Sequence, residues 1–412
     1  MGLWKNLNEV YEFRRAKQNL LNSVAFRIDR PLTKPENVTF LLTHGCNLTC
    51  HMCECGSVGV NPEGGGYIVA KRDEMTREEF AHVIDQLDEW GVRNLIFSGG
   101  EVLLRKHDLL ALVRYAADKG FNTTVVSNSL SWNEDLAKTV ADAGLTNFTS
   151  SLDGACAETH DKIRGKVGSF DKVVRTLRQF EALKQAYPRL STNTTTVVQK
   201  DNWRELPAVC ELLTDCGVGC IMYQAVSGDY PHLLVPLEEL DELKGVLARL
   251  LEMRAAGAKI WNGPEYFETL PRYYTEKLVN QGRFHLGNCL AGYDNLIISP
   301  NGTIDICGYG PHGVSLKDVP LLELWHSQAY REARERIAKC ETQCLYLCYQ
   351  KTDVNQLTKQ VSGVVNLRRR GAAQLSHARV VANDRSTRAP STPPPARPSN
   401  HERGQGWPNA VA

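Results

Sequence analysis

The sequence has 412 residues, of which 42% are hydrophobic and 23% charged, and its formal net charge is +1. This composition is typical of a globular protein, and the near-neutral charge does not favour nucleic acid as the main partner. No stretch is apolar over the length of a membrane span, and the charged N-terminus lacks a signal-peptide cleavage site. We therefore expect a cytoplasmic protein of two or three domains, without a stable nucleic-acid or membrane partner.

Between residues 37 and 234, short apolar runs alternate with helical patterns. The predicted strands are residues 38–43, 92–97, 123–127, 147–152, 192–198 and 218–224. The predicted helices are residues 76–87, 107–120, 134–144, 169–183 and 203–217. Strands that alternate with helices predict an α/β fold with a parallel sheet, and six units fit a partial (β/α)6 TIM-like barrel. The chemistry of such a barrel lies on the loops at the carboxyl ends of its strands.

The regions on either side of this barrel complete the predicted domain organisation. Residues 1–36 read as an N-terminal helical extension, and residues 235–355 as a small α+β domain. Within that domain, residues 296–307 alternate on both sides of Asn301-Gly302, which predicts a hairpin. Residues 356–412 are basic and rich in Pro and Ser, and we expect a disordered, solvated tail.

Thirteen cysteines are informative in a cytoplasmic chain, because thiols there stay reduced and clusters of them indicate metal ligands or catalytic groups. Three of them, Cys46, Cys50 and Cys53, follow the first predicted strand with the spacing CxxxCxxC. Three thiolates hold three irons of a [4Fe–4S] cluster and leave the fourth iron open to a cofactor or substrate. The alternative is a zinc knuckle with Cys55 as the fourth ligand.

With this motif the chain resembles the radical S-adenosylmethionine (SAM) superfamily. The resemblance implies that the open iron chelates SAM. It also implies that the reduced cluster cleaves SAM to methionine and a 5′-deoxyadenosyl radical, which abstracts hydrogen from a substrate. A flavodoxin or ferredoxin-type reductant would supply the electron.

The loop after the second predicted strand extends the resemblance with the sequence SGGE. Its glycines, Gly99 and Gly100, allow a close approach of the backbone, and the resemblance assigns Glu101 to the amino group of SAM. Val102 stands where the family usually has proline. Met52 stands where relatives often have an aromatic residue whose backbone contacts adenine.

Polar residues also follow the third and fourth predicted strands. The resemblance places Ser127 and Asn128 near the ribose of SAM, and Ser151 and Asp153 of the SLDG sequence at further polar contacts. It assigns Arg164 to the SAM carboxylate, which suits a planar and permanently charged group. The simpler alternative for Arg164 is a surface charge at the start of a helix.

A second group of cysteines lies near the C-terminal end. Cys289 is followed by twelve residues, Gly302, four residues and Cys307, which resembles the opening of the SPASM and shorter twitch extensions that hold auxiliary [4Fe–4S] clusters. Five thiols cannot fully ligate two clusters. We therefore expect one auxiliary cluster, held by the first two cysteines and by two of the last three, with a zinc site as the alternative. The sequence does not distinguish among the last three, which are Cys340, Cys344 and Cys348.

These features predict a radical SAM oxidoreductase or epimerase that acts on a small polar metabolite such as a sugar or aminocyclitol. Dehydrogenation would pass an electron to the auxiliary cluster, whereas epimerisation would need a hydrogen donor, for which Cys156 is a candidate. One alternative is a SPASM-type peptide maturase, although the 36 residues before the barrel are too few for a leader-binding module. Another is a non-catalytic iron–sulfur or zinc scaffold.

Overall fold

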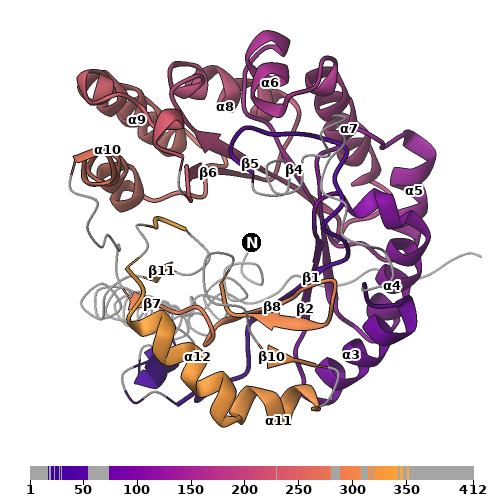
Figure 1. The fold of residues 1–412 in the computed structure, drawn as a ribbon. Coiled ribbons are helices and arrows are strands. Elements are labelled where there is room, and N and C mark those ends of the chain that lie inside the picture. Colours follow the sequence, from indigo (N-terminus) through magenta and orange to yellow (C-terminus); the bar gives the residue numbers. More distant parts are fainter. Residues whose placement is uncertain are drawn as a thin grey trace, which may run out of the picture. The chain divides into compact units, whose positions relative to one another are not determined.

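The computed structural model describes residues 17, 20–22, 24–26, 28, 30–53, 74–228, 230–279, 288–307, 314–316, 319–341, 344–346 and 350–351 (Figure 1). All of them belong to one compact unit, Arg14–Thr358. The predicted tail and most of the predicted N-terminal extension lie outside the described residues. Among the described helices, none has both the length and the apolar character that crossing a membrane requires.

Six parallel strands form the predicted barrel sheet and follow one another in chain order. They are β1 (Asn37–Leu41), β2 (Asn94–Ser98), β3 (Asn122–Ser127), β4 (Asn147–Ser151), β5 (Ser191–Val198) and β6 (Cys220–Ala225). Figure 1 shows helices along their outer side: α3 (Arg77–Glu89), α4 (Lys106–Asp118), α5 (Glu134–Asp142), α6 (Ala157–Arg164), α7 (Ser169–Leu183) and α8 (Leu206–Asp215). The short 3-10 helices η2 (Val102–Arg105) and η3 (Trp203–Glu205) precede α4 and α8. The predicted fold class is confirmed, and the sheet does not close into a full barrel.

Alternate side chains of the strands pack against the helices and form the core. Phe40 lies 5.1 Å from Phe80 of α3, and Phe148 stacks 3.9 Å from Phe180 of α7, between ring centroids. All four rings are fully buried. Because side chains alternate along a strand, this packing fixes which residues face the helices and which face away from them.

We call the opposite side of the sheet the inner face. Along β1–β6 it carries polar and apolar side chains but no charged ones. Register is kept across it; for example, Thr149 of β4 pairs with Asn193 of β5. A closed TIM barrel fills this space with large branched side chains, whereas this face is rich in small polar ones. The inner face consists of Thr39, Leu41, Ile96, Ser98, Thr124, Val126, Thr149, Ser151, Asn193, Thr195, Val197, Cys220, Met222 and Gln224.

The predicted C-terminal hairpin is confirmed, and it extends the barrel sheet. Strand β8 (Asn295–Ile298) pairs parallel with β1 and antiparallel with β9 (Thr303–Asp305), which in turn pairs with β10 (Val314–Ser315). The resulting sheet has nine strands in the order β10-β9-β8-β1-β2-β3-β4-β5-β6. A second, two-stranded sheet joins β7 (Asn288–Cys289) to β11 (Gln350–Lys351). The remaining elements are η4 (Pro231–Leu233), η5 (Leu237–Glu239), α9 (Leu240–Ala255), α10 (Pro264–Val279), α11 (Leu321–His326) and α12 (Gln328–Ala338).

The free edge of β6 is covered by the segment that leads from α9 into α10. The main-chain amide of Ile221 donates to the carbonyl of Lys259, and the carbonyl of Ile221 accepts from the amide of Trp261. The Asn262 side chain accepts from the Tyr223 amide and donates to the Tyr223 carbonyl, both at 2.8 Å. The Tyr266 hydroxyl then accepts from the amide of the last residue of the strand at 2.7 Å. Side chains thus replace the missing neighbouring strand at this edge.

Candidate active site

The three cysteines of the first motif lie on the loop that follows β1. Burial, together with the nearby Cys50, Glu101 and Cys53, raises the pKa of Cys46 to about 11. Burial likewise raises the pKa of Cys50, whereas Arg164 lowers it. The three thiols therefore lie near enough to act on one another, and a bound cluster would displace their protons.

Gly99 and Gly100 are required because the SGGE loop packs directly against the cysteine loop. A Cβ atom on Gly99 would lie 2.4 Å from the Thr43 carbonyl oxygen, and one on Gly100 would lie 2.2 Å from that of Gly45. Two hydrogen bonds of 2.8 Å, from the Gly100 and Glu101 amides to the carbonyls of Thr43 and Gly45, join the loops. The close approach expected at the glycines is therefore to the backbone that carries the cysteines.

Glu101 is 1% exposed and lies between the loops that follow β2 and β3. Its Oε1 accepts from Ser127 Oγ at 2.8 Å and from the Leu103 amide at 3.1 Å, and its Oε2 accepts from the Asn128 amide at 2.9 Å. Burial raises the pKa of Glu101, and these three hydrogen bonds oppose the rise. A carboxylate accepts about four hydrogen bonds, so Oε2 retains capacity for an ammonium group such as that of SAM.

Asn128 connects the β3 loop to the cysteine loop. Its Nδ2 donates to Asn47 Oδ1 at 2.7 Å and lies 3.8 Å from Cys46 Sγ. Ser127 is held in place by the Trp132 indole, which donates to its hydroxyl at 2.8 Å. Asn47, between two of the cysteines, was not among the residues expected from the sequence.

Arg164 is buried beside the cysteine loop, so the alternative of a surface charge is wrong. Its side chain is 11% exposed, its Nη2 lies 2.5 Å from Asp153 Oδ2, and its Nη1 lies 3.7 Å from Cys50 Sγ. Although burial disfavours the charge, Asp153 and Cys50 hold the pKa of Arg164 above its ordinary value. Asp153 Oδ1 accepts from the Val197 amide at 2.7 Å, which fixes the pair to β5. Arg164 Nε has no acceptor among the described residues, which leaves one donor for a ligand carboxylate.

Three other predicted residues lie at the margin of this group. Ser151 belongs to the inner face, and Met52 is half-buried against the core. Cys156 is exposed at the start of α6, eight residues before Arg164 and therefore about 12 Å away along the helix. Its thiol lies 3.6 Å from the Thr159 hydroxyl. Its role as a hydrogen donor stays a prediction.

Gln199, one residue beyond β5, is a candidate that the sequence reasoning missed. It is fully buried, and neither atom of its side-chain amide has a partner among the described residues. Because buried polar groups are normally paired, Gln199 is a candidate ligand contact. The signal was present, because a polar residue after a strand was the criterion applied to the other loops.

The C-terminal cysteines also gather. Burial, together with the nearby Cys307, Cys289 and Cys340, raises the pKa of Cys344 to about 12. Cys348, like Cys55, lies outside the described residues. The structure therefore brings together four thiols, the number that one auxiliary cluster needs.

The described thiols do not form a compact site for one metal ion. No group of three or more His, Cys, Asp or Glu side chains in the described part of the chain is placed to hold such an ion. A zinc ion with Zn–S bonds of about 2.3 Å would draw its sulfurs to within about 4 Å of one another. The donor sets consist of thiols alone, and this is the usual ligand set of an iron–sulfur cluster.

Comparison with known families agrees with this geometry. The model of the radical SAM superfamily matches residues 40–213, and that of the SPASM iron–sulfur cluster-binding domain matches residues 289–349. The chain belongs to the radical SAM superfamily. Its C-terminal part is a SPASM domain.

Relatives match about three quarters of this radical SAM enzyme. The AdoMet-dependent heme synthase of Methanosarcina barkeri is 29% identical over 320 residues, which cover 73% of this chain and 85% of that protein. The mycofactocin maturase MftC of Mycobacterium tuberculosis is 27% identical over 318 residues, or 75% of each chain.

Solved structures share the fold at low identity. The chain resembles Streptococcus suis SuiB bound to S-adenosylmethionine with a TM-score of 0.55 and 15% identity, over 76% of this chain and 69% of that one. It resembles anSMEcpe with bound AdoMet with a TM-score of 0.54 and 17% identity, over 82% and 100% of the two chains.

The cofactors of this radical SAM enzyme are therefore a [4Fe–4S] cluster and SAM, together with an auxiliary iron–sulfur centre in the SPASM domain. When bound, the first cluster and SAM supply a 5′-deoxyadenosyl radical that abstracts hydrogen. Cys46, Cys50 and Cys53 would hold the cluster, and the free acceptor capacity of Glu101 and the free donor of Arg164 suit the amino and carboxylate groups of SAM.

Proposed function

We propose that this radical SAM enzyme is a maturase that abstracts hydrogen from a peptide. The relatives described above are heme synthases and peptide maturases, not sugar-converting enzymes, so the metabolite expected from the sequence has less support than the peptide alternative. The maturase MftC matches 75% of this chain.

The observation that carries the choice of a peptide is the uncharged inner face. Small hydroxyl and amide side chains such as Thr195, Asn193 and Thr124 offer both donors and acceptors, which suit the amide groups of a peptide backbone. A porphyrin with several carboxylates would instead favour cationic partners. No Lys, Arg or His stands among the inner-face residues of β1–β6.

In this proposal each group of residues has its own task. Glu101 and Arg164 orient SAM from two sides of the cysteine loop, and Asp153 keeps Arg164 in place. The inner face holds the peptide, and the auxiliary cluster on Cys289, Cys307, Cys340 and Cys344 accepts the electron left on the substrate after hydrogen abstraction. A flavodoxin or ferredoxin-type protein supplies electrons to the first cluster. We assign the barrel to residues 37–234 and the SPASM domain to residues 235–355.

Deuterium transfer tests the peptide proposal. The anaerobically reconstituted enzyme is supplied with dithionite, SAM and synthetic peptides encoded beside its gene, each deuterated at one residue. We expect deuterium in 5′-deoxyadenosine and a mass change in one peptide. Formation of 5′-deoxyadenosine without label and without change in any peptide would contradict the proposal.

A second candidate is modification of an iron porphyrin, because the heme synthase match covers 85% of that relative. The same assay with iron coproporphyrin III as substrate separates the two. Consumption of the porphyrin, with the peptides unchanged, would favour the second candidate.

A further inference from the structure

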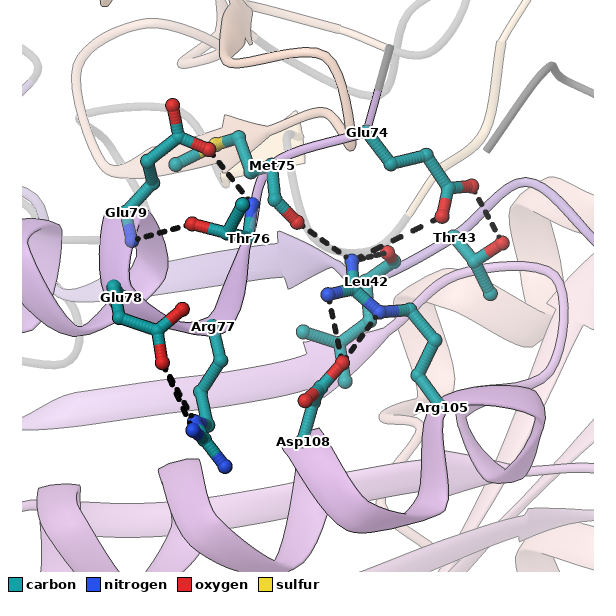
Figure 2. A network of polar contacts seen from close by, with 10 residues as sticks. All are labelled: Leu42, Thr43, Glu74, Met75, Thr76, Arg77, Glu78, Glu79, Arg105 and Asp108. Carbon is teal, nitrogen blue, oxygen red and sulfur yellow. Dashed lines mark hydrogen bonds and ion pairs between the residues drawn. The ribbon is translucent and has the colours of Figure 1, made fainter. Parts of the chain in front are cut away.

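Arg105, four residues after Glu101, makes a set of contacts that the reaction itself does not use (Figure 2). Its side chain is 15% exposed. Nη1 donates to the carbonyls of Leu42 and Met75, both at 2.9 Å, while Nε and Nη2 donate to Asp108 Oδ2 at 2.9 and 2.8 Å. One guanidinium thus ties two separate stretches of main chain to the first turn of α4.

The two carbonyls stand on either side of the segment that carries the first three cysteines. Leu42 comes just before this segment, and Met75 follows it. Glu74 adds a second connection, because its Oε1 accepts from Thr43 Oγ1 at 2.7 Å and its Oε2 lies 3.9 Å from Arg105 Nη1. The Thr43 hydroxyl in turn accepts from the Gly45 amide at 3.0 Å, directly before Cys46. Figure 2 shows this network of contacts around Arg105.

Fixing both ends of a loop removes part of the entropy that ligand binding would otherwise cost. Arg105 is suited to this task because a planar guanidinium reaches several acceptors in fixed directions, whereas an ammonium group is a point charge. Its guanidinium also lies 5.7 Å from the centroid of the Phe80 ring, which limits its movement.

We propose that Arg105 is a positioning residue for the first iron–sulfur cluster. It clasps Leu42 and Met75, which flank the three cysteines in the chain, to Asp108 in the first turn of α4. The thiols and Glu101 thereby keep one arrangement whether or not a cluster is bound. The role is independent of the substrate, and Arg105 itself contacts neither thiol nor SAM.

Chelator challenge of the anaerobically reconstituted full chain tests this role, with Arg105→Lys and Glu74→Gln as variants. The Cys46→Ala variant reports the iron of the auxiliary centre alone. We expect Arg105→Lys to lose the iron of the first cluster about tenfold faster than the wild type, because the cysteine loop loses an anchor at Leu42. The auxiliary iron is expected to remain. Glu74→Gln, which keeps the shape of the side chain, is expected to show a smaller effect of the same kind.

The control is Arg93→Lys, because Arg93 also bonds an aspartate (Asp88) and a carbonyl (Val92), but its side chain is half-exposed and these partners do not belong to the cysteine loop. It should retain iron like the wild type. A spectroscopic readout separates positioning from general stability: SAM should alter the EPR signal of the reduced first cluster less in Arg105→Lys than in the control. Wild-type iron retention and EPR response in Arg105→Lys, or equal loss from both centres, would overturn the proposal.

Discussion

At the residue scale, the buried pair of Asp153 and Arg164 links the SLDG loop to the cysteine loop. Asp153 is fully buried, and Arg164 has its charge directed at Asp153 and at Cys50. Removal of one partner from such a pair leaves an uncompensated buried charge, whereas removal of both does not. The two residues should therefore behave as a unit.

Substitution of this pair is the first prediction. Asp153→Asn and Arg164→Gln should each lower the free energy of unfolding by about 3–5 kcal/mol, because each leaves the charge of its partner buried and unpaired. The double variant should cost less than the sum of the two, as expected for residues in direct contact. Urea unfolding under anaerobic conditions measures all three. Additive costs would show that the pair is not coupled.

The second prediction concerns His160, which is 1% exposed and accepts a hydrogen bond from the Asp153 amide through Nδ1 at 3.1 Å. Burial, with help from Arg164, lowers the pKa of His160 to about 4. An unfolded histidine takes up its proton near pH 6.5, so His160 contributes stability above that pH, and the contribution is lost as the pH falls towards 4. The free energy of unfolding should therefore fall by about 2 kcal/mol more between pH 7.5 and 5 in the wild type than in His160→Gln. Equal pH dependence of the two proteins would contradict this assignment.

At the scale of elements, polar side chains form hydrogen bonds at the edge of the sheet and at the starts of its strands. The open edge of β6 is closed by side chains, chiefly by Asn262, which mimics a paired strand at Tyr223. The first residues of β1–β4 are all asparagines, and some bond one another across the sheet; Asn122 Nδ2, for example, donates to Asn94 Oδ1 at 3.1 Å. The repeated Asn at the start of these strands is visible in the sequence, but our prediction of the strands did not depend on it.

Loss of the Asn262 amide is the third prediction. Asn262→Ala should lower the free energy of unfolding by about 2–4 kcal/mol, because it leaves a buried amide and a buried carbonyl of Tyr223 without partners. Asn193→Ala is the matched control, since Asn193 lies on the neighbouring strand β5 and its side chain forms no hydrogen bond with Tyr223. It should cost less than about 1 kcal/mol. A similar cost for both would show that the edge is not held by this side chain.

The sequence predicts helices and strands well, because the pattern that encodes them is local. It predicts contacts between residues that are distant in the chain poorly. Periodicity located the barrel strands and most helices, and the helix predicted over residues 76–87 begins with a capping box of Thr76 and Glu79. Helix α6 was not expected, because its sequence AETHDKIR is mostly polar and lacks a long apolar stripe. Pairing of β8 with β1 joins residues that are far apart in the chain, and no local pattern encodes that choice.

In the candidate site, too, local motifs were predictable from the sequence and tertiary contacts were not. The cysteine motif and the polar loops were readable because each lies within a few residues of a strand end. The burial of Arg164 depends on Asp153 and on the cysteine loop, and the clasp of Arg105 depends on Leu42 and Met75; these are tertiary contacts. Which thiols gather near Cys344 likewise follows from the fold and not from their spacing.

At the scale of the whole described unit, the barrel and the SPASM domain are joined by more than the chain connection. They share the nine-stranded sheet through β8 and β1. In addition, Gln224 of β6 donates through Nε2 to the Leu345 carbonyl at 3.0 Å, one residue from Cys344. This side chain therefore joins the inner face to the loop that carries Cys344.

The fourth prediction tests this connection. Gln224→Leu should release the auxiliary iron to a chelator about tenfold faster than the wild type, because the loop that carries Cys344 loses an anchor. The first cluster should be unaffected. Gln328→Leu, an exposed glutamine on α12, serves as the control and should behave like the wild type. Faster loss from the first cluster in Gln224→Leu would contradict the assigned contact.

Production of 5′-deoxyadenosine tests the central claim most directly. The reconstituted wild type, with dithionite and SAM under anaerobic conditions, should form 5′-deoxyadenosine and methionine in equal amounts. The Cys50→Ala variant should form neither while it retains its auxiliary iron. Equal product from the variant, or none from a wild type that holds both clusters, would contradict the assignment of the first three cysteines.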